Sequence, residues 1–199
     1  MKNEEKKCVC QKCGANGTVT IWHEIGDDKA QEVMDMSLFR WTCPACGHVY
    51  KFIYPSTYMN KDKAFVVRYQ GNDKEFDQEI CLEGYILRDC NSQEELAEKV
   101  RILEADLDDR AVELMKLLIF AKIHVEDETM EQIQFFRVAE DGDFEFTIWT
   151  GEGPDGIHIS EQVYENVREL AGELPELEPG YHVIDLEWAG LQVSENEGD

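Results

Sequence analysis

Two short stretches decide the fold of the N-terminal region: Cys10-Gln-Lys-Cys13-Gly14 and Cys43-Pro-Ala-Cys46-Gly47. Two residues between paired cysteines allow both thiolates to point into one tight turn, and the glycine that follows supplies the permissive backbone of such a turn. Two such turns that face each other place four thiolates in a tetrahedron, which is the arrangement of a structural zinc site. The sequence therefore predicts that one Zn²⁺ binds to Cys10, Cys13, Cys43 and Cys46.

Two other residues, one cysteine and one histidine, are alternative candidates for the ligand set. The chain has seven cysteines and no recognisable export signal, which disfavours a disulfide framework and favours metal binding. Cys8 offers a slipped first pair with Cys10, and His48 could replace a thiolate or contact one. Cys10 is preferred because its spacing to Cys13 repeats the spacing of the second pair. Cys81 and Cys90 are interpreted as reduced thiols in or near a core.

Several further segments resemble the CpXC family, a group of uncharacterised prokaryotic proteins with paired Cys-Pro-x-Cys motifs. The segments that carry the resemblance are Phe39–His48, Tyr54–Tyr58, Glu94–Val100 and Leu107–Lys116. Gln11 departs from the motif because it stands where the first pair would have proline. The resemblance spans Cys10 to about Lys122 and implies a metal-bound ribbon, but it implies no activity.

A second resemblance competes for the identity of the metal. The spacing of the two cysteine pairs is similar to that of rubredoxin, which carries one electron on a single iron, and both iron and zinc accept four thiolates. The segment Ala15–Val19 differs from the tyrosine-rich and Asp-Pro sequences typical of rubredoxins. Zinc is therefore the prediction, and a rubredoxin-like iron electron carrier is the alternative.

The N-terminal segment reads as a zinc ribbon with a helical insertion. Alternating or β-branched residues predict strands over 18–25, 38–42, 48–54 and 64–69, and residues 55–62 join the last two. A short helix through about Met36 is expected to start at Asp27 or Asp28. Its predicted inward residues are Ala30, Val33, Met34 and Ser37. The polar stretch 70–80 marks a boundary.

The rest of the chain predicts helices followed by a small antiparallel sheet with a packing helix. A strand is expected over 84–89, and Ser92-Gln-Glu-Glu95 is a capping box before a helix with Leu96, Val100 and Leu103 inward. A second helix starts at Asp106 or Asp108, with a wide, largely buried apolar face. Its members are Ala111, Val112, Leu114, Met115, Leu118 and Ile119.

Beyond that helix, the segments 132–139, 143–149 and 157–159 are predicted strands, with a hairpin turn at 140–142. Ser160 is expected to cap a helix, and 181–188 is expected to be a strand. The fold class is therefore α+β, with three segments. They are a ribbon over 1–72, a helical segment over 73–125 that packs on the ribbon or on the C-terminal part, and an acidic α/β part over 126–199.

Charge is distributed unevenly along the 199 residues. Residues 1–70 hold 10 basic and 8 acidic residues, a net charge of +2, whereas residues 71–199 hold 9 basic and 35 acidic residues, a net charge of −26. Such an acidic surface repels phosphate backbones, which disfavours non-specific nucleic-acid binding there. Its simplest interpretation is that it keeps the protein soluble, and the alternative is that it attracts a basic protein partner. No apolar run approaches the ~20 residues that a membrane span needs. The expectation is a cytoplasmic, metal-binding protein.

Catalysis has little support in the sequence. Gly151-Glu-Gly-Pro-Asp-Gly156 lacks the Lys-Ser/Thr of a phosphate loop and is interpreted as a turn between strands. His158 and His182 could meet carboxylates in the acidic half, but no metalloprotease or hydrolase motif is present. Enzyme activity is not predicted. The favoured function is a protein-interaction or adaptor module with a structural zinc site and a partner that is basic.

Nucleic-acid binding by the ribbon itself is the remaining class of function. It would use the basic and aromatic side chains of this segment. These are Lys6, Lys7, Lys12, Arg40, Lys51, Lys61, Lys63, Arg68, Trp22, Trp41, Tyr54 and Tyr58. The small net charge of residues 1–70 gives this class weak support, so structural aromatics on a solvated surface are the preferred interpretation.

Overall fold

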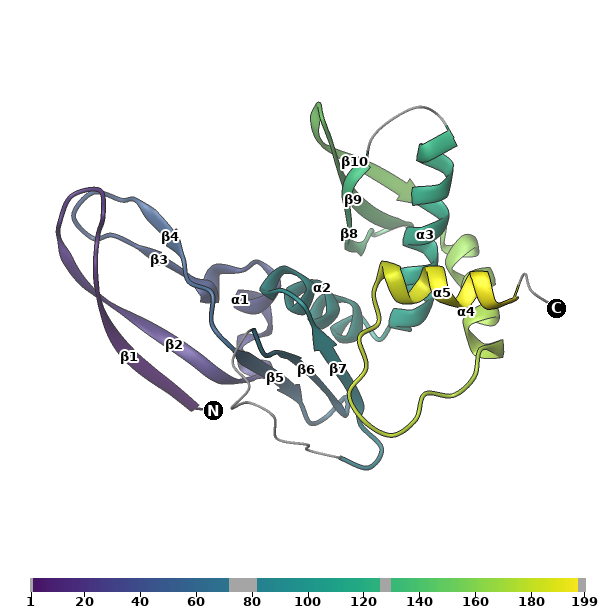
Figure 1. Ribbon diagram of the computed structural model, residues 1–199, viewed down its shortest axis with the longest axis horizontal. Coiled ribbons are helices and arrows are strands. Elements are labelled where there is room, and N and C mark those ends of the chain that lie inside the picture. Colours follow the sequence, from purple (N-terminus) through teal and green to yellow (C-terminus); the bar gives the residue numbers. More distant parts are fainter. Residues whose placement is uncertain (1, 72–81, 126–129, 197–199) are drawn as a thin grey trace. The chain divides into compact units, whose positions relative to one another are not determined.

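The computed structural model describes residues 2–71, 82–125 and 130–196 and has the predicted α+β class (Figure 1). The chain forms two compact units. The first unit is Met1–Val100 with Pro179–Tyr181, and the second unit is Arg101–Glu178 with His182–Asp199. The division into the segments 1–72, 73–125 and 126–199 remains a prediction, because the two compact units do not show which segment folds on its own.

A five-stranded mixed sheet forms the body of the first unit. Its strand order is β1-β2-β5-β6-β7, with parallel pairs β2/β5 and β6/β7 and antiparallel pairs β1/β2 and β5/β6. The strands are β1 (Lys2–Val9), β2 (Asn16–Gly26), β5 (Ser56–Asn60), β6 (Phe65–Tyr69) and β7 (Ile86–Cys90). Strands β2, β6 and β7 confirm the predictions for 18–25, 64–69 and 84–89 within a few residues.

Two strands of this sheet were not predicted from the sequence. The prediction that 55–62 is a connection is wrong, because β5 lies inside it with Ser56, Tyr58 and Asn60 buried. Polar residues at two of the three inward positions hide the alternation that signals a strand. Strand β1 lacks a buried face and pairs with β2 from Lys2 opposite Glu24 to Val9 opposite Asn16.

A helical segment between β2 and β3 confirms the predicted insertion, although it is shorter. It consists of η1 (Asp27–Lys29), α1 (Ala30–Met34) and η2 (Ser37–Phe39). The predicted cap at Asp27 or Asp28 is wrong, because Gly26 holds the N-cap position and no side chain caps it. Of the predicted inward residues only Val33 is buried, and Ser37 is exposed. The chain turns at Met36 with φ of 63°, which ends the helical periodicity before Ser37.

Helix α2 (Gln93–Glu104) begins with the predicted capping box. The backbone N–H of Glu95 donates to Ser92 Oγ at 3.1 Å, and the Glu95 carboxylate accepts the N–H of Asn91 at 2.7 Å. The inward residues predicted for this helix, Leu96, Val100 and Leu103, are buried. The Ser92 bond satisfies an N–H that the helix itself leaves without a partner, as a capping box does, whereas the Glu95 carboxylate bonds to the residue before Ser92 rather than to Ser92 itself.

The segment Pro179–Tyr181 belongs to the first unit although it follows the second unit's sheet in sequence. The Tyr181 ring lies 3.5 Å from the Arg68 guanidinium carbon, and Arg68 also donates to Asp89 Oδ2 at 3.0 Å. A cation–π contact therefore joins this late segment to strand β6.

The second unit packs helices against a three-stranded antiparallel sheet of order β10-β9-β8. Its elements are α3 (Asp109–Val125), β8 (Met130–Val138), β9 (Phe144–Thr150), β10 (Gly153–Ile159), α4 (Glu161–Glu173) and α5 (Leu186–Asn196). Phe135, Phe144 and Phe146 are buried, and Phe144 stacks on Tyr164 of α4 with ring centroids 4.5 Å apart. The predicted hairpin turn at 140–142 and the pairing of 157–159 are confirmed.

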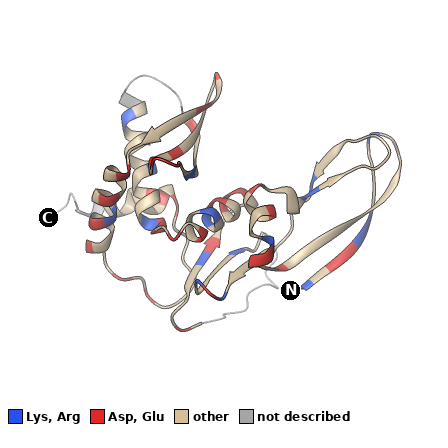
Figure 2. Ribbon diagram, turned by 180° about the vertical axis from the view of Figure 1, so that it is seen from behind, with Lys and Arg blue, Asp and Glu red and all other residues tan. Residues whose placement is uncertain are grey.

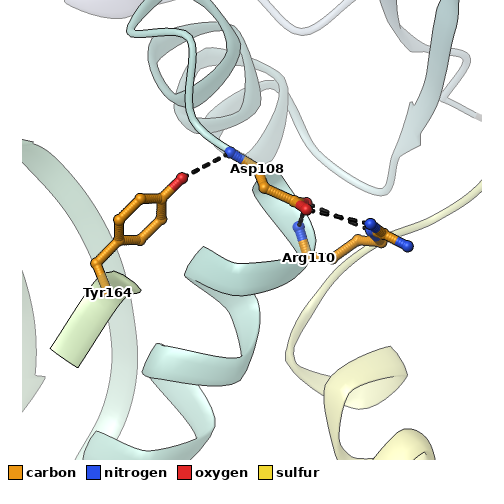
Figure 3. A network of polar contacts seen from close by, with 3 residues as sticks. All are labelled: Asp108, Arg110 and Tyr164. Carbon is orange, nitrogen blue, oxygen red and sulfur yellow. Dashed lines mark hydrogen bonds and ion pairs between the residues drawn. The ribbon is translucent and has the colours of Figure 1, made fainter. Parts of the chain in front are cut away.

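Helix α3 begins where Asp108 accepts hydrogen bonds from Arg110 (Figure 3). Asp108 Oδ1 accepts the backbone N–H of Arg110 at 2.9 Å, and the Tyr164 hydroxyl accepts the N–H of Asp108 at the same distance. Of the predicted apolar face, Leu118 is exposed and Leu114 half-buried, while the other four residues are buried. No helix within the described ranges has both the length and the apolar character of a membrane span.

Ser160 holds the N-cap position of α4 as predicted, although its side chain makes no capping bond. The strand predicted near the C-terminus is wrong. Residues 181–188 form no strand, and Leu186–Asn196 is helix α5 instead. Asp185 accounts for the difference, because its Oδ1 accepts the N–H of Trp188 at 2.9 Å and so starts a helix where the alternating pattern favoured a strand.

Candidate metal centre

The two cysteine turns have the same backbone geometry. In each turn the first cysteine accepts a hydrogen bond from the glycine N–H and donates its own N–H to the residue after that glycine. The bonds are Gly14 N to Cys10 O at 2.8 Å, Cys10 N to Ala15 O at 2.8 Å, Gly47 N to Cys43 O at 2.9 Å and Cys43 N to His48 O at 2.8 Å. Both glycines have positive φ, 75° and 68°. The role predicted for these glycines is therefore confirmed, since residues with a Cβ are strained at such angles.

The tertiary structure brings the two turns together. The first lies between β1 and β2, and the second lies between β3 (Arg40–Thr42) and β4 (Val49–Lys51), which form a two-stranded antiparallel sheet. Strand β4 is shorter than the predicted strand 48–54. The four sulfur atoms all lie within 4.8 Å of one another. The closest pairs are Cys10–Cys46 and Cys13–Cys43, with 3.6 Å between sulfurs in each.

These distances fit a metal ion better than any covalent link between the sulfurs. All four cysteines are free thiols, and their separations are far larger than the roughly 2.05 Å of a disulfide. A tetrahedron with metal–sulfur bonds of 2.3 Å has sulfur–sulfur edges of about 3.8 Å, which lies inside the observed range. The donor set is therefore compatible with one tetrahedral ion of a thiolate-binding metal.

The four cysteines differ in exposure and ionisation. Cys10 and Cys43 are buried, whereas Cys13 and Cys46 are exposed. A hydrogen bond from Tyr50 lowers the pKa of the Cys10 thiol to about 6, although desolvation acts against it. The backbone hydrogen bond at Ala15 lowers the pKa of Cys13, but Cys10, Cys46, desolvation and Cys43 together raise it to about 12. Four sulfurs this close cannot all ionise without a cation to offset their charge.

Tyr50 on β4 contacts the first cysteine turn. Its hydroxyl lies 3.3 Å from Cys10 Sγ and accepts the backbone N–H of Lys12 at 3.0 Å. The ring is held by neighbours on the same small sheet, with centroid distances of 5.8 Å to Trp41 and 4.7 Å to His48. The hydrogen bond to Cys10 raises the pKa of Tyr50, so the hydroxyl keeps its proton. No spacing rule in the sequence indicated this residue.

The alternative ligands lie outside the cluster formed by the described residues. Cys8 is half-buried on β1, opposite Gly17 of β2. His48 directs its ring at Tyr50, and its backbone oxygen takes part in the second turn. Cys90 is buried, which agrees with its interpretation as a core thiol, and Cys81 lies outside the described residues.

The other candidate groups are dispersed. Tyr54 and Tyr58 are buried, so they present no face on which a base could stack. His158 is exposed opposite Glu145 of β9, whereas His182 Nε2 donates to the backbone oxygen of Glu178 at 2.6 Å. Of the turn predicted over Gly151–Gly156 only residues 151–152 form a turn, and the prediction is wrong for Gly153–Gly156, which pair with β9 as the first part of β10. These positions provide no chemistry that competes with the four cysteines.

Comparison with known protein families matches residues 8–116 to the family described as CpXC protein. Comparisons with curated proteins and with solved structures give no match. The matched range covers more than half of the chain and contains both cysteine turns, β2 to β7 and helix α2. Because the matched range and the paired cysteines agree, the chain belongs to the CpXC family.

Proposed function

We propose that this protein binds one Zn²⁺ through Cys10, Cys13, Cys43 and Cys46, and that the ion stabilises the N-terminal ribbon. The observation that supports this most directly is the set of four free sulfurs within 4.8 Å of one another. Four protein thiolates complete a tetrahedral shell, so no position remains at which water or a substrate could be activated. The proposed metal is therefore structural, and its function is to hold a surface in shape.

The local structure explains why this region needs a metal. Strands β3 and β4 pair over only three residues each, and none of those six side chains is buried. A hairpin of this size is at best marginally stable in water. The ribbon therefore depends on contacts with other parts of the first unit and on the bound ion.

We further propose that the biological role is that of a protein-interaction or adaptor module with a basic partner, in the cytoplasm. The second unit contains 6 basic and 26 acidic residues, a net charge of −20. Figure 2 shows Asp and Glu at many places along the helices of this unit. Reduced thiols are maintained in the cytosol, which agrees with a cysteine-based metal site there.

Helix α4 is the part of this acidic surface that best suits a partner. Glu161, Glu165, Glu169 and Glu173 follow one another at intervals of four residues, so they lie along one side of the helix. Val163 and Leu170 on the same helix are exposed, at 37 % and 59 %. Arg168 pairs with Glu165 at 2.6 Å, while Glu161, Glu169 and Glu173 add further negative charge that a basic amphipathic segment would offset as it covers the apolar side chains.

Metal analysis of the full chain, purified under reducing conditions, tests the first proposal. We expect one zinc per chain, and loss of this zinc after substitution of any one of the four cysteines. A Cys8→Ser variant is the matched control, because Cys8 lies on the neighbouring strand and outside the cluster. Zinc-free protein that also fails to take up added Zn²⁺ would contradict the proposal.

Affinity capture tests the proposed partner. The full chain should retain a specific basic protein at low salt and release it at high salt, because screening weakens charge attraction between surfaces. Replacing Glu161, Glu165, Glu169 and Glu173 by glutamine should reduce retention, while glutamine at four acidic positions outside α4 should reduce it less. The absence of any specific protein at low salt would count against an adaptor role.

A rubredoxin-like electron carrier is the second candidate, and one observation favours it. Cys13 and Cys46 are exposed, so an iron ion at this site would have two ligands at the surface, where electrons could enter and leave. Red protein with iron by elemental analysis would establish this candidate in place of the zinc proposal.

A further inference from the structure

We propose that Tyr50 is a positioning residue of the metal centre, whose hydroxyl donates a hydrogen bond to the Cys10 sulfur and ties the first cysteine turn to strand β4. This inference rests on the proposed metal site and assigns a residue that does not itself bind the metal.

The direction of the hydrogen bond follows from the two contacts of the hydroxyl. The backbone N–H of Lys12 lies 3.0 Å from the Tyr50 oxygen and can only donate. The hydroxyl therefore uses a lone pair toward Lys12 and has its single proton available for the Cys10 sulfur, 3.3 Å away. An ionised sulfur only accepts, so the pair is an O–H donor with a thiolate acceptor.

The position of the hydroxyl is determined by packing that does not involve the metal. Tyr50 is paired with Trp41 across the small sheet, and the two rings lie 5.8 Å apart. Trp41 in turn occupies space beside Gly17 of β2, where an added Cβ would approach Trp41 Cζ2 to 2.2 Å. The missing side chain at Gly17 thus makes room for Trp41, which supports Tyr50.

The contact also joins parts that are distant in the sequence. Tyr50 follows the second cysteine turn, yet it binds Cys10 and Lys12 of the first turn. The distance between the two cysteine turns is therefore constrained by a hydrogen bond within the chain as well as by the proposed ion. Groups that orient ligands in this way commonly change metal affinity by roughly 10–100-fold when they are removed.

A hydrogen bond to a thiolate also changes the electronic properties of the bound metal. The donated proton withdraws charge from the sulfur, so the transition that moves an electron from sulfur to a metal such as Co²⁺ requires more energy. Removing the donor should shift that absorption band to lower energy. A residue that only supports the fold would leave the band in place.

The experiment compares Tyr50→Phe with wild type and with Tyr54→Phe, using reduced full-length protein, Co²⁺ as the spectroscopic probe and Zn²⁺ as the competitor. Tyr54 is the matched control, because its hydroxyl donates to Leu38 O at 3.5 Å, away from the cysteines. We expect Tyr50→Phe to bind Zn²⁺ roughly 10–100-fold more weakly and to shift the sulfur-to-cobalt band to lower energy. Tyr54→Phe should change neither property.

The outcomes separate the two proposals. Equal affinity and an identical band in Tyr50→Phe and wild type would overturn the role of Tyr50 while leaving the metal site intact. Failure of the wild type to bind either ion would overturn the metal site itself. If Tyr50→Phe does not fold, protein with 3-fluorotyrosine in place of Tyr50 provides the second measurement. Its more acidic hydroxyl should shift the band to higher energy, and an unchanged band would refute the proposal.

Discussion

Removal of the proposed metal ion should unfold the cysteine turns and leave the larger sheet of the first unit in place. The perturbation is Cys43→Ser, which removes a buried sulfur from the set of four. Serine is nearly the same size but is a poor ligand for a thiolate-binding ion, so the main change is the loss of the metal. The amide hydrogen exchange of β6 and β7 should stay unchanged, because none of the four cysteines lies in these strands.

The size of the effect can be estimated from the small hairpin. Ordering one residue costs about 1–2 kcal/mol, so ordering the stretch from Arg40 to Lys51 costs about 12–24 kcal/mol. A structural zinc contributes roughly 10–16 kcal/mol at neutral pH, which is similar in size. Strands β3 and β4 bury none of their own side chains, so the contacts of Trp41 and Tyr50 offset only part of this cost.

Amide hydrogen exchange followed by mass spectrometry measures this effect directly. The amides to follow are those of Gly14, Cys43 and Gly47, which bond within the two turns. A loss of only about 3 kcal/mol of local stability already accelerates exchange roughly 100-fold. We expect at least this acceleration in Cys43→Ser, with unchanged exchange in Phe65–Tyr69.

Cys8→Ser should exchange like wild type, because this cysteine lies outside the cluster. Unchanged protection of the turns in a Cys43→Ser protein shown to lack metal would refute the reasoning, since the turns would then be stable without the ion.

Three further predictions concern single residues in the two units. Gly17→Ala should destabilise the first unit by about 1–3 kcal/mol in urea unfolding, because the new Cβ would overlap Trp41, and an unchanged midpoint would contradict this. Asp185→Ala should cost about 0.5–2 kcal/mol by removing the cap of α5, whereas Asp185→Asn should retain most of the stability. Hydrogen bonding to Arg137 lowers the pKa of Glu145, so its contribution is complete above the ordinary value of 4.5 and is lost as the pH falls below it. Glu145→Gln should weaken this pH dependence of urea unfolding, and an unaltered profile would argue against the ion pair.

The cysteine turns could be predicted from the sequence because the interactions that form them are local. Each bond within a turn joins residues five positions apart or fewer, and a glycine at a fixed place supplies the positive φ. The same is true of the capping box at Ser92 and of the hairpin turn that ends in Gly142. In all these cases the spacing of a few residue types is sufficient, since no distant part of the chain is needed.

Local pattern also explains where prediction failed. Strand β1 is exposed along most of its length, and β5 buries Ser56 and Asn60, so neither shows an apolar alternation. Their conformation depends on pairing with neighbouring strands. At the start of α5, Asp185 provides a helix cap that the alternating residues around it obscured. Pairing and burial override intrinsic preference in such segments.

From the sequence alone, the repeated spacing of two residues between paired thiols favoured Cys10, Cys13, Cys43 and Cys46 as a metal site, with Cys8 and His48 left as alternatives. The tertiary structure was needed to show that these pairs meet, that two of the sulfurs are buried and two exposed, and that the Tyr50 hydroxyl lies 3.3 Å from the Cys10 sulfur. The reason is that a contact between residues 40 positions apart depends on how strands pair and pack, and the short-range spacing of residue types carries no record of that arrangement.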